Sequence, residues 1–302
     1  MSFAAEVKSE LCRDAVNKKC CALAEAYGVL LYCTVFSPKE IRIVTGCRPF
    51  GERLPRLFRR AFGFGISPLP EISRGGKQTF IITDAGRISA IFEAYGYDAA
   101  GAVAHHINLA VLEESCCKAA FIRGAFLAGG SITDPTKGYH LELVTDHSSV
   151  SRETLSILLE MGFSPKYTSR SGSYITYFKQ SEAIEDLFTT IGAPLAAMEI
   201  MSAKVEKDMR NAVNRRVNCD SANADKIVSA AQQQLDAIRA YDRAVGIGEL
   251  PDKLQETALL RIANPEASLS DLASLSDPPM SKSCLSHRLK KIMELAAELA
   301  AE

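Results

Sequence analysis

The sequence predicts an α+β fold in which a duplicated domain of helices and strands is followed by an all-helical domain. Two observations lead to this prediction. Cysteine and glycine motifs recur at an offset of 96 residues within the first two-thirds of the chain, which indicates an internal repeat. Helix start and stop signals then follow in quick succession near the C-terminus. We expect the duplicated domain at residues 1–200, a linker helix at 201–218 and a helical domain at 219–302.

The internal repeat is visible in four separate segments. The offset is 96 for three of them and 100 for the strand, where the second copy has a longer turn, TDPTKGY. Because chance similarity rarely keeps register across several elements, we interpret residues 16–98 and 112–194 as two copies of one unit. The matching pairs are Cys20-Cys21 with Cys116-Cys117, Gly28 with Gly124, EIRIVT (40–45) with HLELVT (140–145), and SRGG (73–76) with SRSG (169–172).

Each copy is expected to run helix, strand, helix, hairpin, helix. The first helix is apolar on nearly all sides, the strand is apolar or alternating, and the second helix ends at Gly63 or Gly162. The hairpins turn at the glycine-containing segments SRGGK and SRSGS. The expected helices are at about 20–33, 52–62 and 86–95 in the first copy and at about 116–129, 149–161 and 181–191 in the second.

One glycine lies in the body of each first helix, at Gly28 and Gly124. A residue without a side chain lets two helices approach closely. We therefore expect the two first helices to pack against each other there, on a pseudo-two-fold axis that places two sheets side by side.

The segment FIRGAFLAGGSI (121–132) resembles the signature helix of the LAGLIDADG homing endonucleases. The resemblance implies a duplicated αββαββα domain whose sheets form a saddle over the DNA major groove. In those enzymes the signature helices end in acidic residues that hold divalent metals, which need hard oxygen ligands. Cys33 and Gly129 occupy these positions here, and Asp134 lies beyond the helix end. We therefore expect no catalytic residue, no metal, no cofactor and no DNA cleavage.

Several arginines are expected to contact the DNA backbone from the saddle or beside it. Arg42 lies on the expected groove face of its strand, although its counterpart Glu142 would repel phosphate. Arg74 and Arg170 lie at equivalent hairpin tips, and solvated turn arginines are the alternative. The polar stretch 199–218 adds Arg210, Arg215 and Arg216. A degenerate saddle could instead bind a protein partner.

The C-terminal third predicts four helices. The first covers 222–244 and is broken by GIGELP. The next is expected at 252–263, and a short one at SLSDLASLS has Ser268 or Ser270 as its N-cap and Leu269, Leu272 and Leu275 inward. The prolines of the segment Asp277-Pro278-Pro279 force a turn. The last helix is expected at about 281–297.

The last helix combines an apolar stripe with a basic, hydroxyl-rich face. Leu285, Leu289, Ile292, Ala296 and Leu299 recur at spacings of four and three residues. A short helix, a tight turn and such a helix are typical of a helix-turn-helix, whose second helix enters the major groove. A plain amphipathic packing helix is the alternative. The residues expected to contact DNA are Lys282, Ser283, Ser286, His287, Arg288, Lys290 and Lys291.

Charge and composition leave these interpretations open. The net charge of −1 argues neither for nor against nucleic-acid binding. The question depends instead on where the charges lie, and basic stretches occur at 53–60 and 279–291. No apolar run approaches the roughly 18 residues of a membrane helix, and the charged N-terminus is unlike a signal peptide. We therefore expect a cytoplasmic protein with no membrane partner. The nine cysteines form no C-x-x-C pair, which favours packed thiols over zinc binding or redox sensing.

The segments PPMSKSCLSHRLKKI and NRRVNCDSANADKIV resemble the WhiA family of sporulation and cell-division regulators, and the resemblance covers nearly the whole chain. Cys284 departs from it where glycine is expected. The family implies an inactive homing-endonuclease-like domain and a helix-turn-helix similar to the promoter-reading part of sigma factors. The implied function is transcription regulation in cell division, chromosome segregation and sporulation-type development. The implied partners are double-stranded promoter DNA and RNA polymerase or another regulator, at the nucleoid. A metal-dependent endonuclease and a protein-interaction scaffold are the alternatives.

Overall fold

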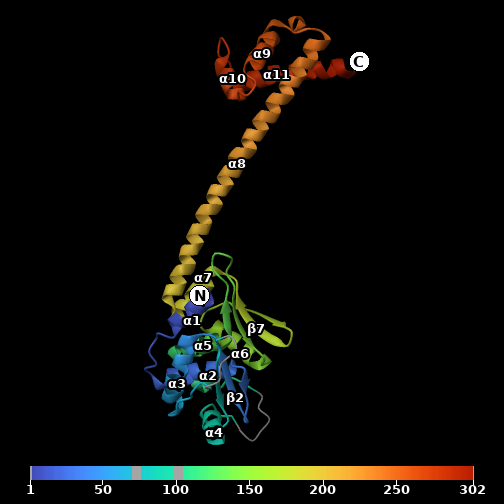
Figure 1. Cartoon of the computed structure of the whole chain (residues 1–302). Coiled ribbons are helices and arrows are strands. Elements are labelled where there is room, and N and C mark those ends of the chain that lie inside the picture. The colour runs from blue at the N-terminus through green and yellow to red at the C-terminus, as the bar shows by residue number, and fades with distance from the viewer. Residues whose placement is uncertain (1, 70–75, 98–104, 302) are drawn as a thin grey trace. The chain divides into compact units, whose positions relative to one another are not determined.

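The computed structural model describes residues 2–69, 76–97 and 105–301. The chain divides into two units, Met1–Asp208 and Met209–Glu302 (Figure 1). The first unit contains both helices and strands, and the second is entirely helical in the residues described. The α+β fold class predicted from the sequence, with a duplicated domain followed by a helical one, is confirmed.

The first unit begins with helix α1 (Phe3–Leu11) and then repeats one series of elements. The 3-10 helix η1 (Leu109–Leu112) precedes the second copy. The first copy contains α2 (Lys19–Leu31), β1 (Val35–Phe36), β2 (Ile41–Thr45), α3 (Arg48–Phe62), β3 (Gln78–Ile82) and α4 (Ala85–Ala94). The second contains α5 (Ser115–Gly129), β4 (Gly130–Ile132), β5 (Leu141–Thr145), α6 (Ser148–Glu160), β6 (Lys166–Arg170), β7 (Ser173–Phe178) and α7 (Ser181–Ile191).

The strands of the described residues form two antiparallel sheets, ordered β1-β2-β3 and β4-β5-β7-β6. The equivalent strands β2 and β5 have the same alternation of buried and half-buried residues, so one face of each sheet packs on the core. The β6–β7 hairpin turns at Ser171 and Gly172, both with positive φ, as the segment SRSGS predicts. The equivalent turn of the first copy, with Ser73 and Arg74, lies outside the described residues.

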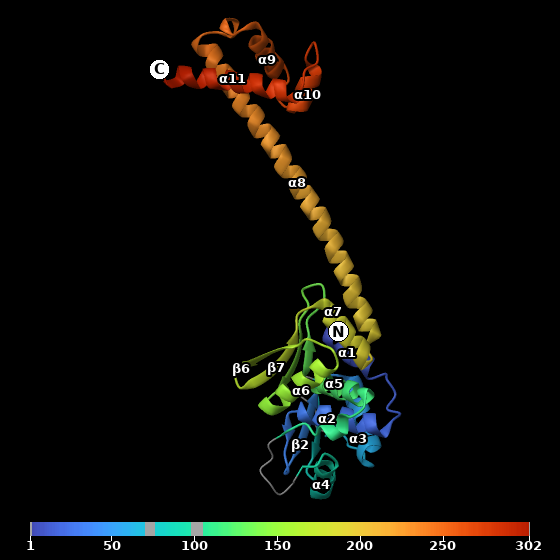
Figure 2. The same ribbon diagram turned by 180° about the vertical axis from the view of Figure 1, so that it is seen from behind.

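Helices α2 and α5 cross at the two glycines, as the sequence predicts, and lie side by side in both views (Figures 1 and 2). A Cβ atom added to Gly28 would lie 2.7 Å from the backbone nitrogen of Ala125. One added to Gly124 would lie 3.0 Å from the backbone nitrogen of Val29. Each glycine therefore meets backbone rather than side chain, and any larger residue would separate the helices.

A buried ion pair lies beside this crossing. The Arg53 guanidinium of α3 donates to both carboxylate oxygens of Glu25 on α2, at 2.6 and 2.8 Å, and both side chains are at most 3 % exposed. Arg53 also donates to the backbone carbonyl of Cys12, and Arg123 of α5 lies 3.4 Å from Glu25. Charges buried this deeply need their partners, so this network ties α2, α3 and α5 together.

Helix α8 (Pro194–Ala244) begins in the first unit and ends in the second. The stretches 199–218 and 222–244 are expected from the sequence to be separate helices. They form this one helix because no glycine or proline interrupts them. Gly246 follows it with a positive φ of 96°. In the described residues, no helix is both long and apolar enough to cross a membrane.

The second unit continues with η2 (Ile247–Glu249), α9 (Asp252–Ala263), α10 (Leu269–Leu275) and α11 (Lys282–Ala301). Ser268 caps α10 in a capping box with Asp271, as one of the two predicted N-caps. The inward position predicted for Leu275 is wrong, because this side chain is 56 % exposed. Leu272, Ala273 and Ser276 define the buried face, and Leu275 lies roughly 100° around the helix from its centre.

Candidate nucleic-acid interface

Helices α10 and α11 are joined by a tight turn that the chain itself braces (Figure 1). The Ser276 hydroxyl donates to the carbonyl of Ala273 at 2.8 Å and accepts the backbone N–H of Met280 at 3.0 Å. The side chain of Ser281 accepts the backbone N–H of Cys284 at 3.2 Å and so caps α11. A short helix, a braced turn and a longer helix therefore follow each other, as in a helix-turn-helix.

Helix α11 buries its apolar stripe in the core of its own unit. The stripe packs with Leu272 of α10, Ala258 of α9 and Tyr241 of α8. Its four buried members are Leu285, Leu289, Ile292 and Ala296. This packing fixes the rotation of α11 and leaves the opposite face free of core contacts.

The opposite face of α11 carries six of the seven side chains predicted to contact DNA. All six are exposed: Lys282, Ser283, Ser286, His287, Lys290 and Lys291. The acidic neighbour Glu294 lies 3.9 Å from the Lys290 ammonium and 3.6 Å from that of Lys291. Such exposed pairs are weak, so both lysines are free to exchange Glu294 for phosphate.

Arg288 differs from the other six. Its side chain is half-buried and its guanidinium donates to the carbonyl oxygen of Lys253, at 3.3 Å, near the start of α9. In this position Arg288 links α11 to α9. A contact between Arg288 and DNA would require this bond to be exchanged.

The arginines of α8 lie apart from any core. Arg215 and Arg216 are exposed, and the Arg215 side chain donates to the carbonyl of Asn211 one turn earlier. A carbonyl acceptor leaves the positive charge of Arg215 unneutralised, so both arginines keep the charge that a phosphate contact needs.

The sheets of the first unit carry both basic and acidic side chains. Arg42 projects from β2 as predicted but forms an ion pair with Glu40 at 2.6 Å. The equivalent residue Glu142 on β5 contacts the His140 ring at 2.5 Å. Arg170 is exposed at the end of β6. Arg74 lies outside the described residues.

The two positions where homing endonucleases carry metal-binding acids offer no oxygen ligand. Cys33 donates to the carbonyls of Leu30 and Val35, and burial raises the pKa of its thiol to about 12, which keeps it neutral. At Gly129 a Cβ atom would lie 2.5 Å from the carbonyl oxygen of Val144, so a carboxylate side chain does not fit without moving the backbone. Asp134 instead braces its turn by accepting the backbone N–H of Thr136.

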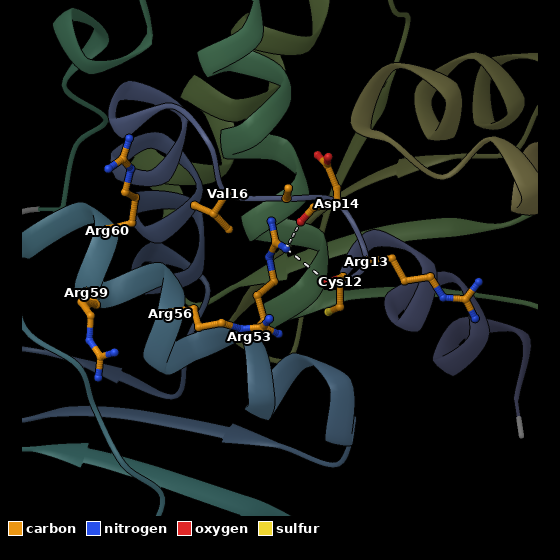
Figure 3. A pocket seen from close by; sticks show the side chains of 9 residues that line it. Cys12, Arg13, Asp14, Val16, Arg53, Arg56, Arg59 and Arg60 are labelled. Carbon is orange, nitrogen blue, oxygen red and sulfur yellow. Dashed lines mark hydrogen bonds between the residues drawn. The ribbon is translucent and has the colours of Figure 1, made fainter.

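A basic pocket lies in the first unit, and the sequence alone does not predict it. It has a volume of about 550 Å³ and is lined by Arg13 after α1 and by Arg56, Arg59 and Arg60 of α3 (Figure 3). The basic stretch 53–60 was its signal in the sequence, but charge runs are usually just solvated faces. Arg53 also borders the pocket but is neutralised by Glu25. The other arginines suit an anion such as phosphate.

Residues 118–210 match the family described as the WhiA LAGLIDADG-like domain, and residues 213–296 match the WhiA C-terminal HTH domain.

Curated relatives named "Probable cell division protein WhiA" match over nearly their whole length. One from Ruminiclostridium cellulolyticum is 37 % identical over 99 % of this chain and 98 % of its own. One from Heliobacterium modesticaldum is 34 % identical over 98 % of this chain and 96 % of its own. The crystal structure of full-length DUF199/WhiA from Thermatoga maritima covers 99 % of both chains with a TM-score of 0.59. At 22 % identity, that structure supports the fold alone.

Proposed function

Because this chain belongs to the WhiA family, we propose that it is a sequence-specific DNA-binding regulator of transcription. The exposed basic face of α11 carries this proposal. Its apolar stripe is held in the core of the second unit, so the helix presents lysines, serines and a histidine outward. These side chains match the chemistry of a major groove flanked by phosphates.

In this proposal the residues of α11 divide into two roles. Ser283, Ser286 and His287 are the short polar groups suited to base edges, while Lys290 and Lys291 are suited to phosphates. Arg215 and Arg216 of α8 are further phosphate contacts. Arg288 positions α11 through Lys253 rather than reading bases, which narrows the set predicted from the sequence.

The first unit then acts without cutting DNA. Cleavage of the homing-endonuclease type needs hard oxygen ligands for its metals. A half-buried neutral thiol at Cys33 and a position without room for a side chain at Gly129 supply none. The unit contributes binding instead, with Arg170 and the basic pocket of α3 as phosphate contacts.

The cellular role follows the family. We propose that the regulated promoters serve cell division, as the relatives' names say, and also chromosome segregation and sporulation-type development. The expected location is the cytoplasm, at the nucleoid. RNA polymerase or a second regulator is the expected protein partner, because a promoter-bound regulator acts on transcription through such contacts.

The test is to map the sites that the full chain occupies across the genome and to measure binding to one site by gel shift. We expect discrete promoter sites and an affinity at least about 1,000-fold above that for random duplex at the same salt concentration. Equal affinity for both duplexes would contradict sequence-specific recognition.

A second candidate function, a protein-interaction scaffold, is favoured by the sheet faces. Arg42 is neutralised by Glu40, and the half-buried apolar residues Val44 and Ile81 lie on the same face. Such a surface suits a polypeptide better than phosphate. Val44→Lys should then disrupt a complex recovered from cells but leave the gel shift unchanged.

A further inference from the structure

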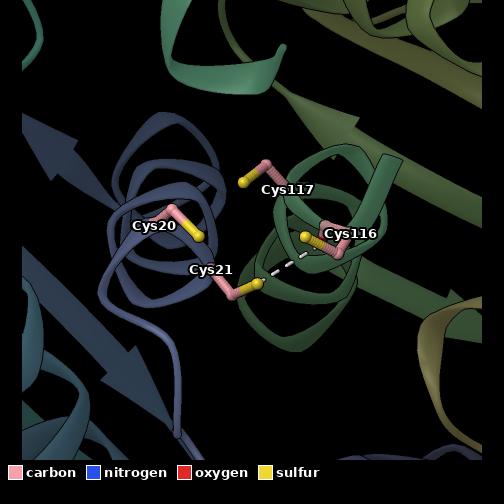
Figure 4. Close-up of side chains that lie close together, drawn as sticks. All are labelled: Cys20, Cys21, Cys116 and Cys117. Carbon is pink, nitrogen blue, oxygen red and sulfur yellow. Dashed lines mark hydrogen bonds between the residues drawn. The ribbon is translucent and has the colours of Figure 1, made fainter. Parts of the chain in front are cut away.

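The structure brings together four cysteines from the two copies of the repeat. Cys20 and Cys21 lie in the first turn of α2, and Cys116 and Cys117 lie in the first turn of α5 (Figure 4). Their four Sγ atoms all lie within 4.8 Å of one another. The sequence favours packed thiols at these doublets. The structure favours a metal site instead, because the crossing at Gly28 and Gly124 aligns α2 with α5 and so brings their N-terminal turns together.

We propose that Cys20, Cys21, Cys116 and Cys117 form a tetrathiolate site for one Zn²⁺ ion. Four sulfurs at about 2.3 Å from a tetrahedral zinc lie about 3.8 Å from one another. The observed sulfurs need to close by at most about 1 Å, which rotation of the cysteine side chains can supply. A mononuclear ion suits so compact a group better than an iron–sulfur cluster, whose thiolates surround a larger inorganic core.

The charges around the four sulfurs favour a bound anion. The N-terminal turns of two helices converge on the sulfurs, and the partial positive charge of each favours an anion there. Lys18 and Lys19 precede the first doublet, and Lys118 follows the second, although Lys118 also pairs with Glu160. Glu113 and Glu114 before the second doublet are the nearby acids in the sequence. A zinc tetrathiolate carries a charge of −2, which the helix ends and lysines partly offset.

The pKa values of the thiols differ from one another. Burial raises the pKa of Cys21 to about 11. Burial also acts to raise the pKa of Cys20, but hydrogen bonds with Cys117 and Cys21 hold this pKa below its ordinary value. Cys20 is also exposed, so it is the first ligand that an incoming ion can reach. Binding replaces four S–H bonds with four Zn–S bonds and releases the protons to solvent.

The site would act as a clip between the repeats. Each copy supplies two of the four ligands, so the ion joins α2 to α5 at the end of their crossing. The Cys21 thiol already donates to the carbonyl of Cys116, at a long 3.8 Å, and zinc would replace this weak link. Structural zinc with four protein ligands leaves no open position for catalysis. The bound zinc would therefore stabilise the first unit and would catalyse no reaction.

The test uses the full chain, reduced and stripped of metal with a chelator. Co²⁺ serves as the first probe, because tetrahedral cobalt thiolates give intense visible and charge-transfer bands. We expect these bands to saturate at one ion per chain and to disappear when one equivalent of Zn²⁺ is added. With free Zn²⁺ at about 100 times Kd, the first unit's Tm should rise by about 5–10 °C.

Matched variants locate the site. The double variant Cys20→Ser with Cys21→Ser should lose the cobalt bands and the zinc-dependent rise in Tm. The double variant Cys219→Ser with Cys284→Ser removes two exposed cysteines of the second unit and should keep both. The proposal is overturned if the reduced wild-type chain shows no cobalt–thiolate bands, or if only the control variant loses them. The proposal would also be overturned if the chain, before the metal is stripped, contained iron and inorganic sulfide in equal amounts, or if its cysteines formed disulfides that persist under reductant.

Discussion

Replacing Gly124 by alanine should destabilise the first unit strongly, although alanine is the better helix former. The added Cβ would lie 2.9 Å from the carbonyl carbon of Glu25 and 3.0 Å from the backbone nitrogen of Val29, and closer still to the Glu25 carbonyl oxygen. Carbon atoms normally approach to about 3.5–4.0 Å. Because the obstacles are backbone atoms of α2, no rotamer change relieves the clash, and the helices must separate.

The magnitude follows from two opposing terms. Overpacking typically costs 1–3 kcal/mol, and a rigid backbone neighbour places this site at about 3 or above. The higher helix propensity of alanine offsets about 1 kcal/mol of this cost. We expect a net loss of about 2–3 kcal/mol in the free energy of unfolding. For a urea m-value of about 2 kcal/mol/M, the midpoint should fall by about 1 M.

The assay is urea unfolding of the full chain followed by near-ultraviolet circular dichroism. Of the tyrosines, only Tyr241 lies in the second unit, so this signal reports the first. The matched control is Gly51→Ala in α3, where the added Cβ meets the flexible end of the Gln78 side chain, with Cδ at 2.8 Å. The control should change stability by less than about 1 kcal/mol. An unchanged midpoint for Gly124→Ala, or an equal loss in both variants, would refute the argument.

Three further predictions follow from other parts of the structure. His287→Ala or Lys290→Ala should weaken specific binding in a gel shift by about 1–3 kcal/mol if the residue contacts a base, and lower the salt slope by about one if it contacts phosphate. Lys137→Ala, in an exposed turn of the first unit, should change neither quantity, and unchanged binding in both α11 variants would exclude this recognition face. Plasmid DNA incubated with the chain and Mg²⁺ should stay supercoiled, because neither signature helix ends in a carboxylate; nicking would disprove this. Burial, helped by a neighbouring histidine, lowers the pKa of His105 from 6.5 to about 4, so the first unit should lose stability as the pH falls from 6.5 to 4, and His105→Phe should flatten that part of the curve.

Patterns with a fixed period gave correct predictions for the elements. The recurrence of the glycine after 96 residues and of the strand at 41–45 after 100 residues predicted the duplicated unit and its central crossing. Turn and cap residues gave the break at Gly246 and the start of α10 after Ser268. These signals are local or repeated, so one sequence suffices to detect them.

What failed depended on contacts between residues far apart in the chain. Arg53 belongs to a basic stretch, yet it is buried because Glu25 meets it from another helix. The bond from Arg288 to Lys253 could not be predicted either, because it depends on the position of α9, while a contact of Arg288 with DNA stays a prediction. Leu275 has apolar spacing, but a helix as short as α10 buries a narrow face. None of these partners can be identified from composition or period.

The reciprocal crossing of α2 and α5 has a consequence for biosynthesis. Helix α2 buries its glycine against residues that are added to the chain almost a hundred positions later. Such a high contact order slows folding, and the ribosome must release the segment up to about residue 129 before either copy can complete its core. Until then the nascent chain exposes one of its most apolar helices. A single copy made alone would have the same unsatisfied surface and should pair with another of its kind.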